Sequence, residues 1–224
     1  MSLHHSPKIV TDGLILYLDA ANPKSYPGTG NYVYDLKHNA SNITFYNTPV
    51  LTENSFDFIS LDTDGLSIAS TNYSGELTNF TMECIFKINS THLHYDGALI
   101  SSGNWNSSHW AFSINQNNTA IVTRNPSVTH SYNFNLNSWY NVIYRRNATT
   151  INFFINNIKS QDYTSSNNIP LTSDATNTAI GRETYASGYF NFNGKIPIIK
   201  IYNRALSDQE IQQNFNAIRG RYGI

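Results

Sequence analysis

Apolar and polar residues alternate with a period of two in short runs along most of this chain. The run at residues 80–87 is the clearest, with Phe80, Met82, Cys84 and Phe86 at its alternate positions. This period is typical of a β-strand with one face in a core. Similar runs, separated by Asn-, Gly- and Asp-rich turns, lie at 13–20, 56–70, 98–103, 110–125, 131–160, 177–183 and 193–203. About a dozen short strands joined by such turns predict an all-β, antiparallel two-sheet sandwich.

The C-terminal residues 201–224 follow a different pattern. Ser207 and Glu210 have the S-x-x-E spacing of a capping box, which marks the start of a helix. An apolar stripe follows at i, i+4 and i+7, formed by Ile211, Phe215 and Ile218. Gly220 is the predicted end of this helix. Because so short a helix is marginal alone, we expect the stripe to dock on the edge of a sheet or an end of the sandwich.

Composition supports one domain with a sizeable core. Hydrophobic residues make up 40% of the 224 positions and charged residues 13%, about half the charged share of an ordinary soluble domain. We therefore expect a single domain over residues 1–224. The net charge of -1 and the pI near 6.6 exclude the strongly basic field that holds nucleic acid or an anionic membrane.

The N-terminus and the single cysteine bear on location. Residues 1–10 lack a positively charged start and a long apolar segment, so no secretory signal is predicted. No apolar run approaches the roughly 18 residues that span a bilayer. Cys84 excludes an internal disulfide, and its place in an alternating run predicts a small, buried side chain. We expect synthesis in the cytoplasm of the cell that makes the protein.

Asparagine is unusually frequent, at 31 residues. Asn tolerates left-handed backbone and hydrogen-bonds its own main chain, so a protein with many hairpins can use it heavily. The alternative interpretation is a compositional bias of an AT-rich genome.

Several motifs together resemble a known family. They are "GLILYLDAANPKSYPG" (13–28), "SWYNVIYRRNATTINFFINNIK" (138–159), "AIGRE" (179–183) and "YFNFNGKIPIIKIYNRALSDQEIQQNFNA" (189–217). The chain resembles the laminin-G-like, concanavalin A-like lectin/glucanase superfamily, in the single-domain form found in tailed bacteriophages. The resemblance covers nearly the whole chain and is most specific at its C-terminal motif. Residues 37–42, "KHNASN", depart from the glycine-rich run that the family has there.

The resemblance implies a jelly-roll sandwich with one short C-terminal helix. It also implies a non-enzymatic virion protein, either decorating the capsid or associated with a tail or fibre. Its partners would then be other virion proteins, and self-association into a homo-oligomer is compatible with this role. The alternative is a lectin that binds a glycan on the host surface. Because one fold hosts lectins, hydrolases and adhesion modules, the function must be argued from a site.

A glycoside hydrolase needs two carboxylates that face the scissile bond. The glucanases of the superfamily place them on an E-x-D-x-x-E or E-x-D-x-E strand. The five glutamates here, Glu53, Glu76, Glu83, Glu183 and Glu210, are never followed two residues later by Asp. Glu83 stands alone on its strand, and Glu210 belongs to the capping box. The sequence therefore disfavours hydrolysis.

Two segments have the residues of a metal site. Asp62 and Asp64 precede Gly65 and could contribute oxygen ligands to Ca²⁺, although an ordinary Asp-Gly turn is the simpler explanation. His92 and His94, followed by Asp96, could hold a transition metal, and a solvated loop is the alternative. No cofactor is expected to be required, and Ca²⁺ is the candidate ion.

Sugar binding favours exposed aromatic rings beside amide side chains. Trp105, with Asn104 and Asn106 around it and His109 in the same segment, is the best candidate. The alternative for Trp105 is a lid on the end of the sandwich. Two other tryptophans, Trp110 and Trp139, are predicted core residues. Two charged pairs, Arg145–Arg146 and Arg182–Glu183, are predicted to be solvated or to pair between strands.

Overall fold

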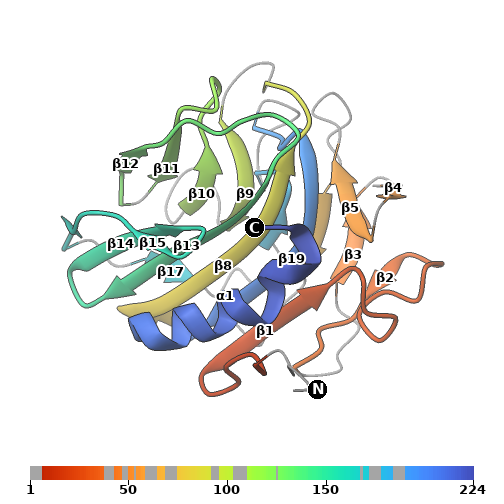
Figure 1. Ribbon diagram of the computed structural model, residues 1–224, viewed down its shortest axis with the longest axis horizontal. Coiled ribbons are helices and arrows are strands. Elements are labelled where there is room, and N and C mark those ends of the chain that lie inside the picture. Colours follow the sequence, from red (N-terminus) through yellow and green to blue (C-terminus); the bar gives the residue numbers. More distant parts are fainter. Residues whose placement is uncertain are drawn as a thin grey trace, which may run out of the picture.

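A computed structural model describes residues 7–37, 43–46, 50–52, 54–58, 65–68, 75–91, 96–102, 110–124, 126–166, 169–171, 178–183 and 190–224. Over these residues the chain forms two antiparallel sheets, a small additional sheet and a C-terminal helix (Figure 1). This confirms the predicted all-β sandwich with a closing helix. None of the helical residues in this part of the chain forms a segment long and apolar enough to cross a membrane.

The first sheet carries the helix. In spatial order its described strands are β15 (Ile158–Lys159), β14 (Thr150–Ile155), β13 (Trp139–Asn147), β8 (Asn79–Ile88), β19 (Gly194–Tyr202), β5 (Ser55–Phe58) and β4 (Val50–Thr52). In addition, β1 (Leu14–Asp19) pairs with β19, and β16 (Tyr163–Thr164) pairs with β14. The long strands β8, β13 and β19 form its centre, so most of the predicted core runs meet there.

The second sheet packs against the first. Its described strands, in spatial order, are β12 (Val128–Ser131), β11 (Ala120–Arg124), β10 (Trp110–Ile114), β9 (Gly97–Ser102), β18 (Thr178–Ile180), β6 (Gly65–Ile68), β3 (Ile43–Tyr46) and β2 (Tyr32–Val33). A separate pair is formed by β7 (Gly75–Leu77) and β17 (Ile169–Leu171).

The core lies between the two sheets. As the alternation predicts, Phe80, Met82, Cys84 and Phe86 of β8 face it and are fully buried. Trp110 lies in the same core, with 1% of its surface exposed. Burial raises the pKa of the Cys84 thiol well above its ordinary value, which agrees with a packing role for this side chain.

Several of the asparagines occupy turn positions with left-handed backbone. Of the six described residues other than glycine with positive φ, five are asparagine: Asn54, Asn118, Asn137, Asn156 and Asn157. The last two form the tight turn between β14 and β15, where Ile155 pairs with Ile158. A two-residue turn with both φ angles positive matches the twist of a hairpin, and Asn is one of the few residues that adopt it readily. The high asparagine content therefore has a structural use in this fold.

The helix α1 (Asp208–Tyr222) starts as predicted and ends later. The Glu210 amide donates to the Ser207 hydroxyl and the Ser207 amide donates to the Glu210 carboxylate, which completes the capping box. The predicted end at Gly220 is wrong, because the helix continues through it to Tyr222. Gly223, with φ of 69°, is the left-handed C-cap and donates its amide to the Arg219 carbonyl.

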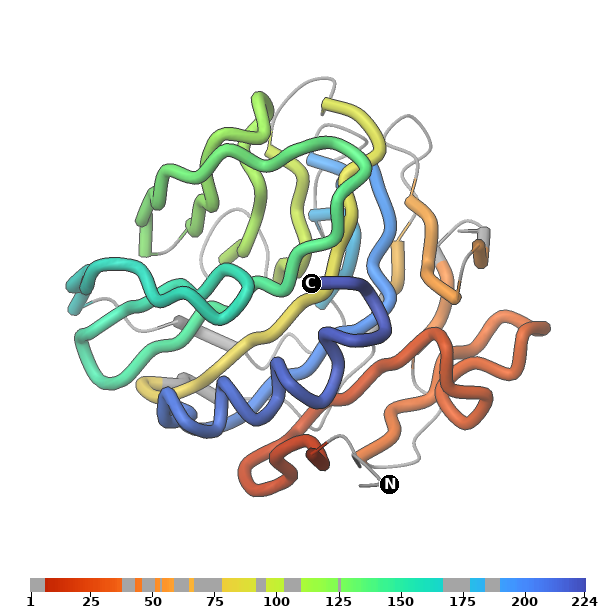
Figure 2. The backbone as a smooth tube through the Cα atoms, viewed as in Figure 1, coloured from red at the N-terminus to blue at the C-terminus, as the bar shows by residue number. Residues whose placement is uncertain are grey.

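The helix lies on the outer face of the first sheet, across β8 and β19 (Figures 1 and 2). Ile211, Phe215 and Ile218 are buried there, as the stripe predicts, and Asn214 is buried beside them. Trp139 is the exception to the core prediction. It is partly buried, and it packs against Tyr222 at the end of the helix, with ring centroids 5.0 Å apart. Its position at the start of β13 puts it on the helix side of the sheet.

Candidate functional site

The outer face of the first sheet holds a buried ion pair beneath α1. Glu83 and Lys200 are directly opposite each other on β8 and β19, and both side chains are 0% exposed. The Lys200 ammonium donates to a Glu83 carboxylate oxygen at 2.9 Å. Asn214 of the helix and Asn141 of β13 donate to the same carboxylate at 3.0 and 2.9 Å. Glu83 is therefore not the solitary strand residue that the sequence indicated.

The N-terminal segment closes this network. The Val10 amide donates to the Asn214 side-chain oxygen, and the Tyr202 hydroxyl donates to the Val10 carbonyl. Burial, and after it the nearby Glu83 charge, raises the pKa of Tyr202 well above its ordinary range. These groups are paired with one another and shielded from water, so the network holds α1 and the N-terminal segment on the sheet and offers little to a ligand.

The outer face of the second sheet is built differently. Its floor consists of small side chains that lie side by side on β9, β10 and β18, namely Ala98, Ser101, Ala111, Ser113 and Ala179. Their exposure does not exceed 4%. A floor of small residues leaves room for larger polar side chains to lie flat over the strands.

A charged cluster lies over this floor. Arg124 at the end of β11 contacts Asp96 through Nη2 at 3.2 Å and Glu183 through Nη1 at 3.1 Å. The Phe190 ring lies 4.2 Å from the guanidinium carbon. The side chains of Arg124 and Asp96 are 28% and 25% exposed, whereas that of Glu183 is fully buried. We call these four residues the Arg124 cluster.

The prediction that Arg182 and Glu183 are a solvated or cross-strand pair is wrong. Gly181, with φ of 77°, turns the chain after β18, and a side chain there would collide with Phe58. The Arg182 carbonyl then accepts from Ser101, and the Arg182 side chain lies against Gly65. This path carries Glu183 back over the sheet to Arg124, a contact between residues far apart in the sequence.

Arg145 and Arg146 have different surroundings. Arg146 is 1% exposed and donates to the carbonyls of Ala148 and Ser165. Arg145 is an interstrand and helix contact, since it donates to Asn152, to the Leu206 carbonyl and to Asp208. Arg145 therefore fits the predicted pairing role, and Arg146 is buried instead of solvated.

One buried polar group on the floor of the second sheet lacks a partner. The Ser113 hydroxyl is in a side chain that is 1% exposed, and it makes no hydrogen bond within the described part of the chain. The register of β9, β10 and β11 places Ser113 between the level of Arg124 and that of Asp96. Unsatisfied buried groups are uncommon in folded proteins, and a bound water or ligand is one explanation for them.

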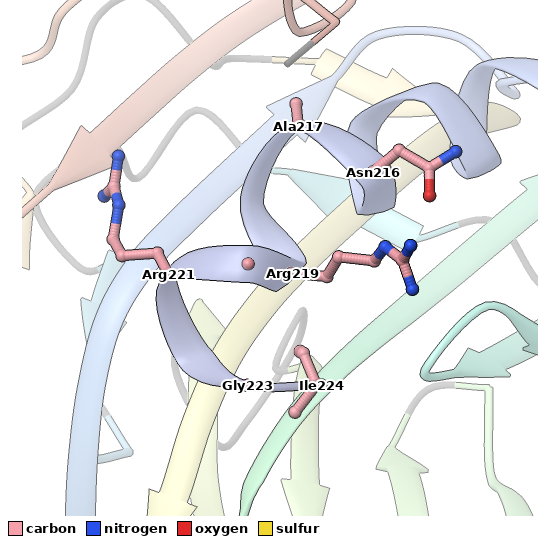
Figure 3. A pocket seen from close by; sticks show the side chains of 7 residues that line it. Asn216, Ala217, Arg219, Arg221, Gly223 and Ile224 are labelled. Carbon is pink, nitrogen blue, oxygen red and sulfur yellow. The ribbon is translucent and has the colours of Figure 1, made fainter. Parts of the chain in front are cut away.

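A hollow lies at the C-terminal end of α1. It has a volume of about 490 Å³ and is lined by Asn216, Ala217, Arg219, Gly220, Arg221, Gly223 and Ile224. Figure 3 shows that the Arg219 and Arg221 side chains point away from each other. Arg221 is held by both oxygens of Asp19 at 2.8 Å. Because its charged groups diverge, this hollow has no converging polar contacts for a ligand, and the Arg124 cluster is the better candidate site.

The site residues proposed from sequence lie outside the described residues. This applies to Trp105, Asn104, Asn106 and His109, to the calcium candidates Asp62 and Asp64, and to His92 and His94. Asp96 is described, and it pairs with Arg124. Within the described ranges no group of three His, Cys, Asp or Glu side chains could hold a metal ion. Calcium binding and the Trp105 site stay predictions.

Sequence reasoning missed Arg124 and Phe190 as site residues. Arg124 closes the run "AIVTR", in which Ile121 and Thr123 face the core side, so the alternation already indicates an outward side chain. Nothing in the sequence indicates Phe190 or the return of Glu183, because both depend on how the chain folds back after β18.

Comparison with known proteins identifies the fold. Residues 60–212 match the model of a family described as "Concanavalin A-like lectin/glucanases superfamily". No curated protein sequence matches the chain.

Solved structures with the same fold include proteins of different kinds. The binding domain of botulinum neurotoxin serotype D is 18% identical with a TM-score of 0.68, over 91% of this chain and 50% of that chain. Trypanosoma rangeli sialidase in complex with sialic acid is 14% identical, with a TM-score of 0.67, over 97% and 36%. Domain 4 of the arabinanase AbnA from Geobacillus stearothermophilus, in complex with arabinotriose, is 12% identical, with a TM-score of 0.60, over 91% and 98%.

These likenesses establish the fold alone. This chain spans about a third to a half of the sialidase and neurotoxin chains that it matches. The fold occurs in enzymes and in binding domains, and at these identities it does not distinguish between them.

Proposed function

The chain belongs to the concanavalin A-like lectin/glucanases superfamily, and we propose that it is a non-enzymatic carbohydrate-binding protein that acts in adhesion. The observation that carries this proposal is the Arg124 cluster. It combines a half-buried aromatic ring with partly exposed polar groups on the outer face of a sheet. Such a surface suits a sugar, whose hydroxyls need hydrogen-bonding partners and whose C–H faces pack on aromatic rings.

A binding role fits the described carboxylates better than hydrolysis. Retaining and inverting glycosidases both need two carboxylates that reach the substrate. On the outer face of the second sheet Asp96 is partly exposed, but Glu183 is fully buried against Arg124. Glu83 is sealed under α1, and Glu210 is held in the capping box by Arg204 and Ser207. These three glutamates are therefore unsuited to a catalytic pair.

The site of action proposed here is a tailed-bacteriophage particle. The support is the resemblance of the C-terminal motif to the single-domain phage form of the family. The protein would be made in the host cytoplasm, join other virion proteins at the capsid or at a tail or fibre, and contact a glycan on the host surface. Neighbours of this fold whose structures contain sialic acid or arabinotriose support a glycan as partner.

A glycan array tests the binding proposal. The purified protein is applied with and without Ca²⁺, beside the variants Asp96→Ala and Trp105→Ala. We expect specific binding that either variant weakens at least about tenfold, the equivalent of 1.4 kcal/mol. The matched control is Asp162→Ala, which removes a carboxylate exposed beside Lys159 on the first sheet. Binding to no glycan, or equal loss in the control, would overturn the proposal.

Mass spectrometry of purified particles tests the location. We expect the protein among the virion components. Its presence together with an absence of glycan binding would support a purely structural role, such as capsid decoration. Its absence from particles would overturn the virion assignment. Release of reducing sugar from any glycan would overturn the non-enzymatic assignment.

A further inference from the structure

We infer that the Arg124 cluster selects uncharged glycans and rejects acidic ones, such as those ending in sialic or uronic acid. This inference rests on the proposed carbohydrate binding and adds the class of sugar. An arginine can bind the carboxylate of an acidic sugar, but Arg124 already contacts two carboxylates of the protein itself.

Both ends of the Arg124 fork are already occupied by carboxylates. A guanidinium recognises a carboxylate most strongly through two parallel N–H donors. Here Nη1 contacts Glu183 at 3.1 Å and Nη2 contacts Asp96 at 3.2 Å. A ligand carboxylate would have to displace one of them. It would also approach the other at close range, and like charges at that distance repel.

The guanidinium is held in this position. The Phe190 ring covers one of its faces at 4.2 Å, a favourable cation–π distance. Glu183 is fully buried, so turning Arg124 away would leave a buried carboxylate without this cation. Removing one partner from a buried ion pair is strongly unfavourable. The free-energy cost of moving Arg124 therefore opposes the binding of an acidic glycan.

Arg182 does not offset the repulsion of a ligand carboxylate by Asp96 and Glu183. Arg182 is 9% exposed, with its side chain against Gly65 and its Nε donating to the Glu183 carbonyl. Among the described residues over this floor, two guanidinium groups and two carboxylates thus cancel in formal charge, and the partly exposed ones are Asp96 and Arg124. The free capacity of Asp96 is that of an acceptor, which suits the hydroxyl of a neutral sugar.

The test compares matched pairs of glycans on one array, each a neutral oligosaccharide and the same oligosaccharide carrying a terminal sialic or uronic acid. For the wild-type protein we expect the neutral member to bind at least about tenfold more tightly. Raising the salt from about 0.05 M to about 0.5 M should reduce this preference, because the exposed part of the repulsion is screened.

Asp96→Asn supplies the decisive variant. It keeps the shape of the side chain, removes one negative charge and weakens the contact at one end of the Arg124 fork, because a neutral amide oxygen accepts more weakly than a carboxylate. We expect the preference for neutral glycans to fall at least about threefold, through stronger binding of the acidic member. Asp162→Asn is the control, since it removes the charge of an exposed carboxylate between β15 and β16 of the first sheet, and it should leave the preference unchanged.

The outcomes separate this inference from the proposed function. If neither member of any pair binds, carbohydrate binding itself is wrong. If wild-type protein binds the acidic member equally or better, carbohydrate binding stands and the selectivity is wrong. An unchanged preference in Asp96→Asn would also refute the assigned role of the cluster.

Discussion

The two outer faces of this sandwich carry similar chemistry in opposite settings. Beneath α1, Glu83 and Lys200 form an ion pair with both side chains 0% exposed. On the other sheet, Asp96 and Arg124 form one with about a quarter of each side chain exposed. The first pair has further hydrogen-bonding partners on β13 and on α1, and the second faces outward from its sheet.

This difference separates a structural role from a binding role. Charges removed from water are tolerated only where hydrogen bonds replace the lost hydration. Glu83 meets that condition through Lys200, Asn141 and Asn214. The geometry of α1 thus depends on the pair, and the pair has no capacity left for a ligand. Partly exposed groups such as Asp96 exchange water for a ligand at small cost, which makes their face the one suited to binding.

The sharpest test of the comparison removes one carboxylate from each face. Glu83→Ala leaves Lys200 buried without its counter-charge, and we expect the free energy of unfolding to fall by about 3–5 kcal/mol. Asp96→Ala removes a partly exposed group and should cost about 1 kcal/mol or less. Urea denaturation followed by fluorescence measures both. Similar losses for the two variants would contradict the distinction between the faces.

A double variant shows whether the buried charge or the packing matters. Replacing both partners, Glu83→Met with Lys200→Met, removes the unpaired charge. We expect it to be more stable than Glu83→Ala, because apolar replacements of a buried pair are often nearly neutral. A double variant as unstable as the single one would show that Asn141 and Asn214 need the carboxylate.

The end of the helix allows a smaller test of the covered face. Gly223 has φ of 69° as the C-cap, whereas Gly220 lies inside α1 with open space where a side chain would be. Gly223→Ala should lower the free energy of unfolding by about 1 kcal/mol, since the left-handed region is costly for other residues. Gly220→Ala should raise it by about 0.5–1 kcal/mol, because glycine weakens a helix interior.

Thermal unfolding of the two glycine variants measures these effects in opposite directions. A destabilised Gly220→Ala would show that the hollow beside Gly220 needs its empty space. That result would favour the hollow at the end of α1 over the second sheet as the candidate site.

The two glycines also show where sequence reasoning reaches its limit. The capping box and the stripe of Ile211, Phe215 and Ile218 are local patterns, and both were predicted correctly. Gly220 resembles a helix stop as much as Gly223 does, and the two differ only in their backbone conformation. The strand alternation likewise predicted which face of β8 enters the core. The burial of the opposite face of β8 could not be predicted in the same way, because it depends on α1 lying over that face.

The candidate site was hardest to predict because it is assembled from distant segments. The cluster consists of residues from distant segments, namely Asp96, Arg124, Glu183 and Phe190. Glu183 reaches Arg124 because the chain turns at Gly181, directly after β18. Each residue by itself has an ordinary local pattern. Trp105 and its neighbours had a recognisable composition, and they lie outside the described residues, so that prediction awaits the binding experiment.

The start of α1 gives the smallest expected effect, and it depends on pH. The hydrogen bond from Arg204 is the main cause that lowers the pKa of Glu210 to about 2 from its ordinary value of 4.5. Because the folded pKa is lower than the unfolded one, this carboxylate stabilises the fold above about pH 4.5. That contribution is lost as the pH falls from 4.5 towards 2. The Glu210 side chain is partly exposed, and solvent screens its ion pair with Arg204, so we expect about 1 kcal/mol or less.

Glu210→Gln isolates this effect. The free energy of unfolding of wild type should exceed that of the variant at pH 7, and the gap should narrow below about pH 4.5 and close near pH 2. A gap that is independent of pH would mean that Glu210 acts through the hydrogen bonds of the capping box, which glutamine can also form. The helix would then be held on its sheet by its buried apolar stripe and by the network around Glu83, with no contribution from the charge of Glu210, and the contrast between the two faces would be greater than the surface charges suggest.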